Sequence, residues 1–267
     1  MLAKLLEGKI IADRIKEGLK DRVRSLEHLP VLASIVIGEN AGAISYAKSQ
    51  QKLAVELGIE YCLHSLPCDA AESQIVELIQ KLNNDKNVHG IIVQTPLPKQ
   101  IDSKSISRFI LRNKDIEGVN SPVVAAVMEL IKTSGVDLYS KEVVVVGHSE
   151  ILGKPLALLL LDKFATVTVC HIGTSKAGKL EEHVRRAEVL IVAVGKAGLI
   201  KGEWIKEGAV VIDVGINRLG DKIVGDVEFP AAEKRAAYIT PVPGGVGPLT
   251  VAILMRNLVE AAVAQQS

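Results

Sequence analysis

A glycine turn between a buried strand and a helix is the first place in this sequence where residue types suggest chemistry. The run is E-V-V-V-V-G-H-S-E-I-L-G-K-P, from Glu142 to Pro155. The valines predict a strand buried on both faces, and the glycine after them lets the chain turn. A helix that begins near Gly153 starts with unpaired N–H groups, which can bind a pyrophosphate. The spacing Gly-x-Ser-x-x-x-Gly is a weak dinucleotide signal by itself, because an ordinary strand-to-helix turn also fits it.

Gln94 is a second candidate, because it lies at the predicted carboxyl end of a strand. The strand V-H-G-I-I-V-Q runs from Val88 to Gln94 and leads directly into T-P-L-P. Proline lacks the N–H donor that a strand ladder needs, so the strand ends there. Open α/β sheets bind their ligands at such ends, although a glutamine that only bonds its own loop fits the position equally well.

A third candidate is the loop I-T-P-V-P-G-G-V-G-P-L-T, from Ile239 to Thr250. Its three prolines and three glycines predict an irregular, fixed backbone. Loops of this kind are often functional, and the alternative is a rigid crossing between domains.

The segments between these candidates alternate between predicted strands and helices, which indicates α/β architecture. A polar, turn-rich stretch from Asn113 to Pro122 separates two α/β units. We expect strands at 31–37, 59–66, 88–94, 143–146, 166–170, 189–194 and 210–214, and helices at 8–26, around 45–57, 71–82, before 112, at 123–131, from 153, at 180–186 and at 251–263.

Composition bounds the protein class. The chain has 267 residues, with 48% hydrophobic residues but only 3% aromatic ones, which suits a core of aliphatic side chains in two domains. A net charge of +1 with no basic block argues against nucleic acid as a partner, and we expect no membrane span and no export signal. Cys62, Cys68 and Cys170 show no metal-ligand spacing, so we expect no metal site and reduced thiols in a cytoplasmic protein.

Together these motifs resemble the methylenetetrahydrofolate dehydrogenase/methenyltetrahydrofolate cyclohydrolase family, the FolD proteins of one-carbon metabolism. The resemblance covers essentially the whole chain and rests on four runs: P-V-P-G-G-V-G-P-L-T at 241–250, V-Q-T-P-L-P at 93–98, G-H-S-E-I-L-G-K-P at 147–155 and V-I-D-V-G-I-N-R at 211–218. It implies two α/β domains with a cleft between them. These would be a folate-binding catalytic domain at 1–119, completed by a helix at 248–267, and a Rossmann-like NAD(P)-binding domain at 120–247. It also implies a homodimer that binds tetrahydrofolate derivatives.

The resemblance also implies the substrate-side residues. Tyr46 falls on a tyrosine that faces the folate in relatives, and Gln94 and the loop Pro243, Gly244 and Gly245 help to place it. Gln50 falls where relatives have a lysine, one helical turn after the tyrosine. Glu117 falls where relatives usually have aspartate, and its carboxylate can accept hydrogen bonds from the pterin's amino and ring N–H groups. The chain is also shorter than its relatives between residues 118 and 122.

The glutamine at position 50 affects the family's two reactions differently. Hydride transfer from methylenetetrahydrofolate to the nicotinamide needs positioning and no proton relay. Hydrolysis of the methenyl product moves protons and calls for an acid/base group, which a glutamine does not supply. Lys48 and Lys52 lie about 200° around the helix from Gln50, so neither replaces it. We therefore expect a dehydrogenase with weak or absent cyclohydrolase activity.

NADP is the cofactor that the sequence favours, with NAD as a possible alternative. The predicted strand at 166–170 is followed by H-I-G-T-S-K, without the acidic residue that would bind the ribose of NAD. A 2′-phosphate would instead meet His148, Thr174, Ser175 and Lys176. The resemblance assigns cofactor binding to Gly147, His148, Ser149, Gly153, Thr174, Ser175 and Ile216, although relatives often have arginine at position 148 and serine at position 172.

Two rival functions remain. One is a Rossmann dehydrogenase for another small substrate, such as a shikimate-type or amino-acid dehydrogenase, in which Gln94 and the Pro243 loop would have no role. The other is a nucleotide- or folate-binding sensor without catalysis, which the residues Gln50 and Glu117 make conceivable.

Overall fold

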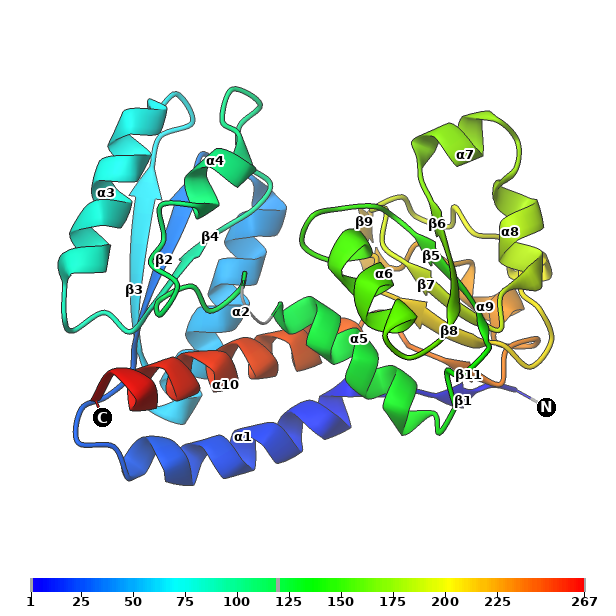
Figure 1. The fold of residues 1–267 in the computed structure, drawn as a ribbon, viewed down its shortest axis with the longest axis horizontal. Coiled ribbons are helices and arrows are strands. Elements are labelled where there is room, and N and C mark those ends of the chain that lie inside the picture. The colour runs from blue at the N-terminus through cyan, green and yellow to red at the C-terminus, as the bar shows by residue number, and fades with distance from the viewer. Residues whose placement is uncertain (1, 119–120, 267) are drawn as a thin grey trace. The chain divides into compact units, whose positions relative to one another are not determined.

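The computed structural model describes residues 2–118 and 121–266, and the chain divides into two compact units. One unit contains Met1–Ile11 and Val123–Thr250, and the other contains Ala12–Pro122 and Val251–Ser267. The sequence placed residues 1–119 together, whereas here β1 (Lys4–Leu5) pairs in parallel with β11 (Tyr238–Ile239) and so joins the opposite unit. Figure 1 shows the helices and strands of both units.

The unit of residues 12–122 and 251–267 is built on a three-stranded parallel sheet in the order β3-β2-β4. Its central strand β2 (Val31–Ile37) is buried along its whole length, between β3 (Glu60–Leu66) and β4 (Gly90–Val93). The odd-numbered side chains of β2 pack on α3 (Glu72–Asn84), which contributes Ile75, Ile79 and Leu82. The short helix α4 (Ser103–Ser107) adds Ile106 to the same core.

The other face of this sheet carries the even-numbered side chains of β2, because successive residues of a strand point to opposite faces. Helix α2 (Ala41–Leu57) packs against β2 and β3. Asn40 caps its first turn by accepting a hydrogen bond from Ala43 N, and Gly58, with φ of 75°, ends it. These ends fix which α2 residues are buried, Gln50 among them. Helices α1 (Gly8–Arg24) and α10 (Val246–Gln266) carry residues of both units.

The second unit has a six-stranded parallel sheet in the order β1-β11-β8-β7-β5-β6. The chain forms β5 (Glu142–Val146), crosses to β6 (Thr166–Cys170) on one side, and returns to β7 (Val189–Val192) and β8 (Val210–Asp213) on the other. The direction of winding therefore reverses at β5, and such switch points are where open α/β sheets bind ligands. The remaining elements are α5 (Pro122–Thr133), α6 (Gly153–Leu161), α7 (Ile172–Lys176), α8 (Leu180–Arg186), η1 (Gly202–Trp204), α9 (Phe229–Ala232) and the antiparallel hairpin of β9 (Asn217–Leu219) and β10 (Lys222–Val224).

These units confirm the expected α/β architecture, with differences at short elements. Helix α6 begins at Gly153, as the sequence predicts, whereas α10 begins at Val246, inside the predicted irregular loop. Val246 and Leu249 are buried, so packing favours helix over the turn residues around them. The two- and three-residue strands β1, β9, β10 and β11 were not expected, because such short segments carry no readable periodicity.

Helix α10 also corrects the expectation that no segment is long enough to span a membrane. By length and composition alone its residues qualify, with a mean hydropathy of 1.4. In the 18-residue stretch of α10 that gives this value, 61% of the residues are buried inside the protein, as in the core helix of a globular fold.

The contact between β4 and α10 gives a stability prediction. A Cβ at Gly90 would lie 2.6 Å from Leu258 Cδ1 and 2.9 Å from Ile116 Cγ2. We expect Gly90→Ala to lower the free energy of unfolding by about 1–3 kcal/mol, because those buried side chains must shift. Gly18→Ala is the matched control: a Cβ there meets nothing within 4 Å, and alanine in a helix should stabilise by about 0.5–1 kcal/mol. Urea unfolding of both variants measures the difference, and a neutral Gly90→Ala would contradict this packing.

Candidate functional site

Two buried glutamines from different elements are hydrogen-bonded to each other in the smaller-sheet unit. Gln50 projects from α2 and Gln94 follows β4, and their side chains are 0% and 2% exposed. Gln94 Nε2 donates to Gln50 Oε1 at 2.7 Å and to Ser34 Oγ on β2 at 2.9 Å. Tyr61 on β3 donates its hydroxyl hydrogen to Gln50 Oε1 at 3.2 Å. We call Ser34, Gln50, Tyr61 and Gln94 the amide cluster.

The amide cluster leaves two polar atoms unsatisfied. Both hydrogens of Gln94 Nε2 are used, and Gln50 Oε1 already accepts two hydrogen bonds. Gln50 Nε2 and Gln94 Oε1 are buried and have no partner among residues 2–118 and 121–266. Such unpaired buried groups typically cost about 1–3 kcal/mol, so they mark a place where a ligand's polar groups fit.

Tyr46 and Glu117 lie next to this cluster and influence each other. Burial raises the pKa of Tyr46 strongly, the Glu117 carboxylate raises it further, and the Gln50 side chain opposes both. Burial also raises the pKa of Glu117 to about 7, with a contribution from the neighbouring Asp115 carboxylate. A carboxyl group with this pKa is divided between its acid and its carboxylate near neutral pH.

Three local contacts position Glu117. Lys114, three residues before Glu117 in the chain, is buried. It donates from Nζ to the carbonyl oxygens of Leu82 at 2.9 Å and Asp85 at 2.6 Å. Asn257 of α10 donates to Ile116 O at 3.0 Å.

The third contact closes the turn after Glu117. Asp115 Oδ1 accepts hydrogen bonds from Glu117 N at 3.2 Å and Gly118 N at 2.7 Å. A Cβ at Gly118 would lie 2.2 Å from Asp115 Oδ2, so a larger residue there would displace the carboxylate that closes the turn. The chain around Glu117 is therefore held at its neighbours on both sides.

The structure therefore brings four residues singled out from the sequence, Tyr46, Gln50, Gln94 and Glu117, into one unit. Sequence reasoning missed Ser34 and Tyr61. For Ser34, a signal existed in the single hydroxyl within V-L-A-S-I-V-I, a strand that is otherwise apolar. Lys48 and Lys52 are exposed, as expected for side chains on another face of α2.

The loop with Pro243, Gly244 and Gly245 lies in the other unit. Gly244 has φ of 111°, which favours glycine, and its carbonyl accepts a hydrogen bond from Lys9 N at 3.1 Å. A Cβ at Gly8 would lie 2.0 Å from Gly245 O. The start of α1 and this loop therefore fix each other's backbone.

The glycine turn after β5 has the close contacts expected of a nucleotide-binding turn. Gly147 has φ of 129°, and a Cβ there would lie 2.4 Å from Ala193 O. A Cβ at Gly153 would lie 2.2 Å from Gly147 O, and Ser149 Oγ accepts from Gly153 N at 3.4 Å. Only glycine fits at positions 147 and 153, so the start of α6 faces the turn through backbone alone.

The segment after β6 forms the short helix α7, which the sequence did not predict. His171 accepts from Gly173 N at 3.1 Å, and Thr174 Oγ1 accepts from His171 N at 3.2 Å. The ring of His171 lies 5.4 Å from that of His148, between centroids, so the ends of β5 and β6 are adjacent. Thr174 and Ser175 are half-buried in α7, while Ile216, at the tip beyond β8, is 65% exposed.

Two buried carboxylates that the sequence did not reveal hold the neighbouring strand ends. Asp226 is fully buried and accepts hydrogen bonds from the backbone N–H groups of Val194 at 2.7 Å, Gly195 at 3.0 Å and Lys196 at 2.7 Å. Asn217 Nδ2 donates to it at 2.8 Å. The loop after β7 is therefore shaped by a residue about 30 positions further along the chain.

Asp213, at the end of β8, is the second carboxylate. It accepts from the backbone N–H groups of Gly215 at 2.9 Å, Asp226 at 3.0 Å and Val227 at 2.9 Å. Burial nevertheless raises the pKa of Asp213 to about 6, because desolvation outweighs these donors.

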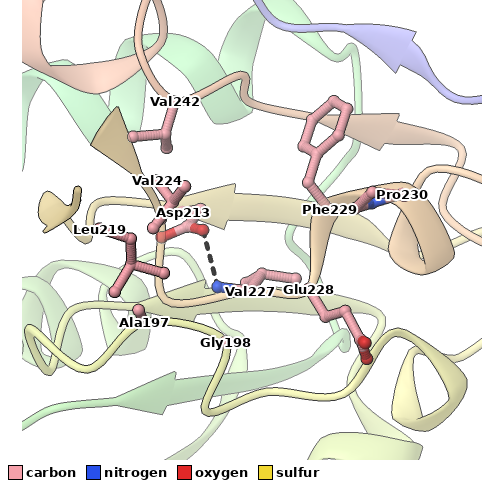
Figure 2. Close-up of a pocket in the computed structure, with 11 residues that line it drawn as sticks. Ala197, Gly198, Asp213, Leu219, Val224, Val227, Glu228, Phe229, Pro230 and Val242 are labelled. Atoms are coloured by element: carbon pink, nitrogen blue, oxygen red, sulfur yellow. Dashed lines mark hydrogen bonds between the residues drawn. The ribbon is translucent and has the colours of Figure 1, made fainter. Parts of the chain in front are cut away.

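A pocket of about 410 Å³ adjoins Asp213 in this unit (Figure 2). Its lining contains none of the residues that the sequence assigned to folate or cofactor. Leu219, Val224 and Val242 lie on one side and Phe229 on the other, and the dashed line marks the bond from Val227 N to Asp213. In the part of the chain that the structure describes, no three His, Cys, Asp or Glu side chains are grouped to hold a metal ion.

Comparison with known proteins supports both halves of this description. Residues 6–117 match the family described as tetrahydrofolate dehydrogenase/cyclohydrolase, catalytic domain, and residues 121–266 match its NAD(P)-binding domain. The bifunctional protein FolD of Acetivibrio thermocellus is 47% identical, covering 99% of both chains. Bifunctional protein FolD 2 of Geobacter metallireducens is 45% identical, over 98% of this chain and 97% of that one.

A solved structure agrees over the same length. The Trypanosoma brucei methylenetetrahydrofolate dehydrogenase-cyclohydrolase, complexed with NADP and an inhibitor, has a TM-score of 0.92 and 34% identity, over 99% of this chain and 98% of that chain. With both domain descriptions matched and near-complete coverage of its relatives, this chain belongs to the tetrahydrofolate dehydrogenase/cyclohydrolase family, the FolD proteins.

Proposed function

We propose that this protein is an NADP-dependent 5,10-methylenetetrahydrofolate dehydrogenase that forms 5,10-methenyltetrahydrofolate, and that its cyclohydrolase activity is weak or absent. The observation that carries the proposal is the gathering of Tyr46, Gln50, Gln94 and Glu117 around buried, unpaired amide atoms in a domain of this family. The proposal includes the cytoplasmic homodimer that the resemblance implies.

The site is suited to hydride transfer because that reaction needs a fixed pose and no proton relay. NADP, when bound, supplies the hydride acceptor. The unpaired Gln50 Nε2 and Gln94 Oε1 offer one donor and one acceptor to the folate, and Glu117 as a carboxylate accepts from the pterin's N–H groups. The methenyl product is a cation, and a neutral amide at position 50 does not repel it as an ammonium would.

The glycine turn provides the fit for the cofactor. Gly147 and Gly153 leave backbone exposed where any Cβ would clash, and Ser149 closes the turn, so we assign the pyrophosphate to this segment. His148, Thr174 and Ser175 come from the adjacent ends of β5 and β6, which suits a 2′-phosphate on the ribose. Ile216 supplies an exposed apolar surface for the cofactor.

The first test is turnover. We expect purified protein to reduce NADP with methylenetetrahydrofolate, measured as absorbance at about 340 nm, and to use NAD less well. Gln94→Ala should lower kcat/KM by about 10- to 100-fold, because it removes one amide and leaves the other with a missing partner. If both ligands bind but NADP is not reduced, the protein is a sensor. If only another small substrate is turned over, the protein is a different dehydrogenase.

The second test concerns the lysine that relatives carry at position 50. We expect the wild-type protein to hydrolyse methenyltetrahydrofolate at close to the spontaneous rate, and Gln50→Lys to raise the enzymatic rate at least about tenfold, since a buried amine supplies the missing acid/base group. Loss of methenyl absorbance measures the rate. Lys48→Gln and Lys52→Gln are the controls, and robust wild-type hydrolysis that survives both would refute this part of the proposal.

The third test uses the pKa of Glu117, about 7 in the protein without ligand. If the carboxylate form binds the pterin, tetrahydrofolate affinity should be constant above pH 7 and fall by up to about tenfold per pH unit below it. Anaerobic calorimetry from pH 5.5 to 8.5 measures this dependence. In Glu117→Gln the affinity should be lower and nearly independent of pH across that range, and an unchanged profile would contradict the role of Glu117.

The raised pKa values of Glu117 and Asp213 also predict how these two groups affect stability. A carboxyl group whose pKa is raised by folding stabilises the native state below its unfolded pKa, and this contribution is lost as pH rises through the folded value. Glu117 and Asp213, at about 7 and about 6, therefore both favour the folded protein more at pH 5.5 than at pH 7.5. Folate binding by Glu117 and the contribution of these two groups to stability should therefore change in opposite directions with pH.

A further inference from the structure

Ser34 lies at a buried position where packing alone does not require a hydroxyl group. It is 0% exposed at the centre of β2, between Ala33 and Ile35, which are also fully buried. An alanine there would leave no polar atom to satisfy, so the hydroxyl is explained by what it bonds. Its partner is Gln94 Nε2, at 2.9 Å.

Tyr61 supplies the second hydroxyl of the same hydrogen-bonded row. It lies half-buried on the edge strand β3 and reaches Gln50 Oε1 at 3.2 Å. The row therefore runs from Tyr61 through Gln50 and Gln94 to Ser34, and the Ser34 hydroxyl also bonds to Tyr61, so the two hydroxyls are neighbours.

This row restricts how the amides can be oriented. A hydroxyl can donate or accept, so rotating both amides together by half a turn gives a second fully bonded arrangement. In either arrangement one glutamine is left with a free N–H and the other with a free carbonyl. Rotation of one amide alone would set N–H against N–H or oxygen against oxygen, which costs the amide–amide hydrogen bond. Each hydroxyl gives its amide a second hydrogen bond, Ser34 to Gln94 and Tyr61 to Gln50, and so fixes the plane of that amide.

We propose that Ser34 and Tyr61 are positioning residues that hold the planes of the Gln50 and Gln94 amides, so that the pair presents one donor and one acceptor to the folate. The inference rests on the function proposed above and deepens it. Without either hydroxyl, one amide keeps only its bond to the other amide and can tilt, the substrate ring is held in more than one pose, and hydride transfer slows because its geometry is less well fixed.

The test compares Ser34→Ala, Tyr61→Phe and the double variant in single turnovers, with methylenetetrahydrofolate limiting and with enzyme and NADP in excess at concentrations well above the dissociation constants. The rate constant measured in this way does not depend on the fraction of enzyme that is folded. We expect each single change to lower it about 3- to 10-fold, as for one lost hydrogen bond, with the Kd for NADP unchanged. The double variant should lose less than the product of the two single effects, because both hydroxyls act on one unit.

Matched controls separate this role from general effects of the substitutions. Ser65→Ala changes an exposed serine on the same strand as Tyr61, and Tyr139→Phe changes an exposed tyrosine of the other unit, so both should match the wild-type rate constant. Ser34→Thr keeps the hydroxyl and should recover to within about twofold of wild type. If Ser34→Ala does not fold, Tyr61→Phe and Ser34→Thr decide the question.

The outcomes distinguish this inference from the proposed function. Wild-type turnover together with Ser34→Ala and Tyr61→Phe within twofold of it would overturn the positioning role alone, as would a Ser34→Thr variant as slow as Ser34→Ala. A wild-type protein that neither binds tetrahydrofolate by calorimetry nor reduces NADP would overturn the proposed function and this inference with it.

Discussion

The need to satisfy two glutamine amides inside an apolar unit is the constraint on which the folate-side site depends. Gln50 and Gln94 are buried by the packing of α2 and β4 against β2, and neither can reach water. Their hydrogen bonds must come from elements already in contact, which are β2 and β3. The register of the sheet and the caps of α2 therefore set the geometry of the amides before any substrate binds.

Burial also determines the pKa values of two carboxyl groups in this protein. Lys114, three residues before Glu117 in the chain, is buried, and its ammonium bonds backbone carbonyl oxygens at the end of α3. Glu117 thus has Asp115 as a charged neighbour and a raised pKa. In the other unit Asp213 accepts three backbone hydrogen bonds and still has a raised pKa. In both cases desolvation is the largest effect, and local donors or charges only adjust it.

Sequence reasoning succeeded where a signal lies within one element and failed where it depends on pairing between elements. The valine run of β5, the start of α6 at Gly153 and the strand end at Gln94 are local features, and the structure has them. Ser34 and Tyr61 are brought to Gln94 and Gln50 only by the order β3-β2-β4 and its register. Likewise, Asp226 bonds Val194 from 32 positions away, and β1 depends on β11 at the other end of the chain.

The amide cluster also fits a site that supports hydride transfer from the methylene folate but not hydrolysis of the methenyl product, as we propose. Every group in it is neutral, and each hydrogen bond joins an uncharged donor to an uncharged acceptor. Such a cluster can hold a ring in place and tolerate a cationic product, but it has no proton to exchange near neutral pH. The titratable groups in or next to the cluster are Tyr46 and Tyr61, whose pKa values burial drives upward, and Glu117, which we assign to the pterin. Under the proposed function, adding water to the methenyl carbon would lack a proton carrier, whereas hydride transfer needs only the positioning that these groups supply.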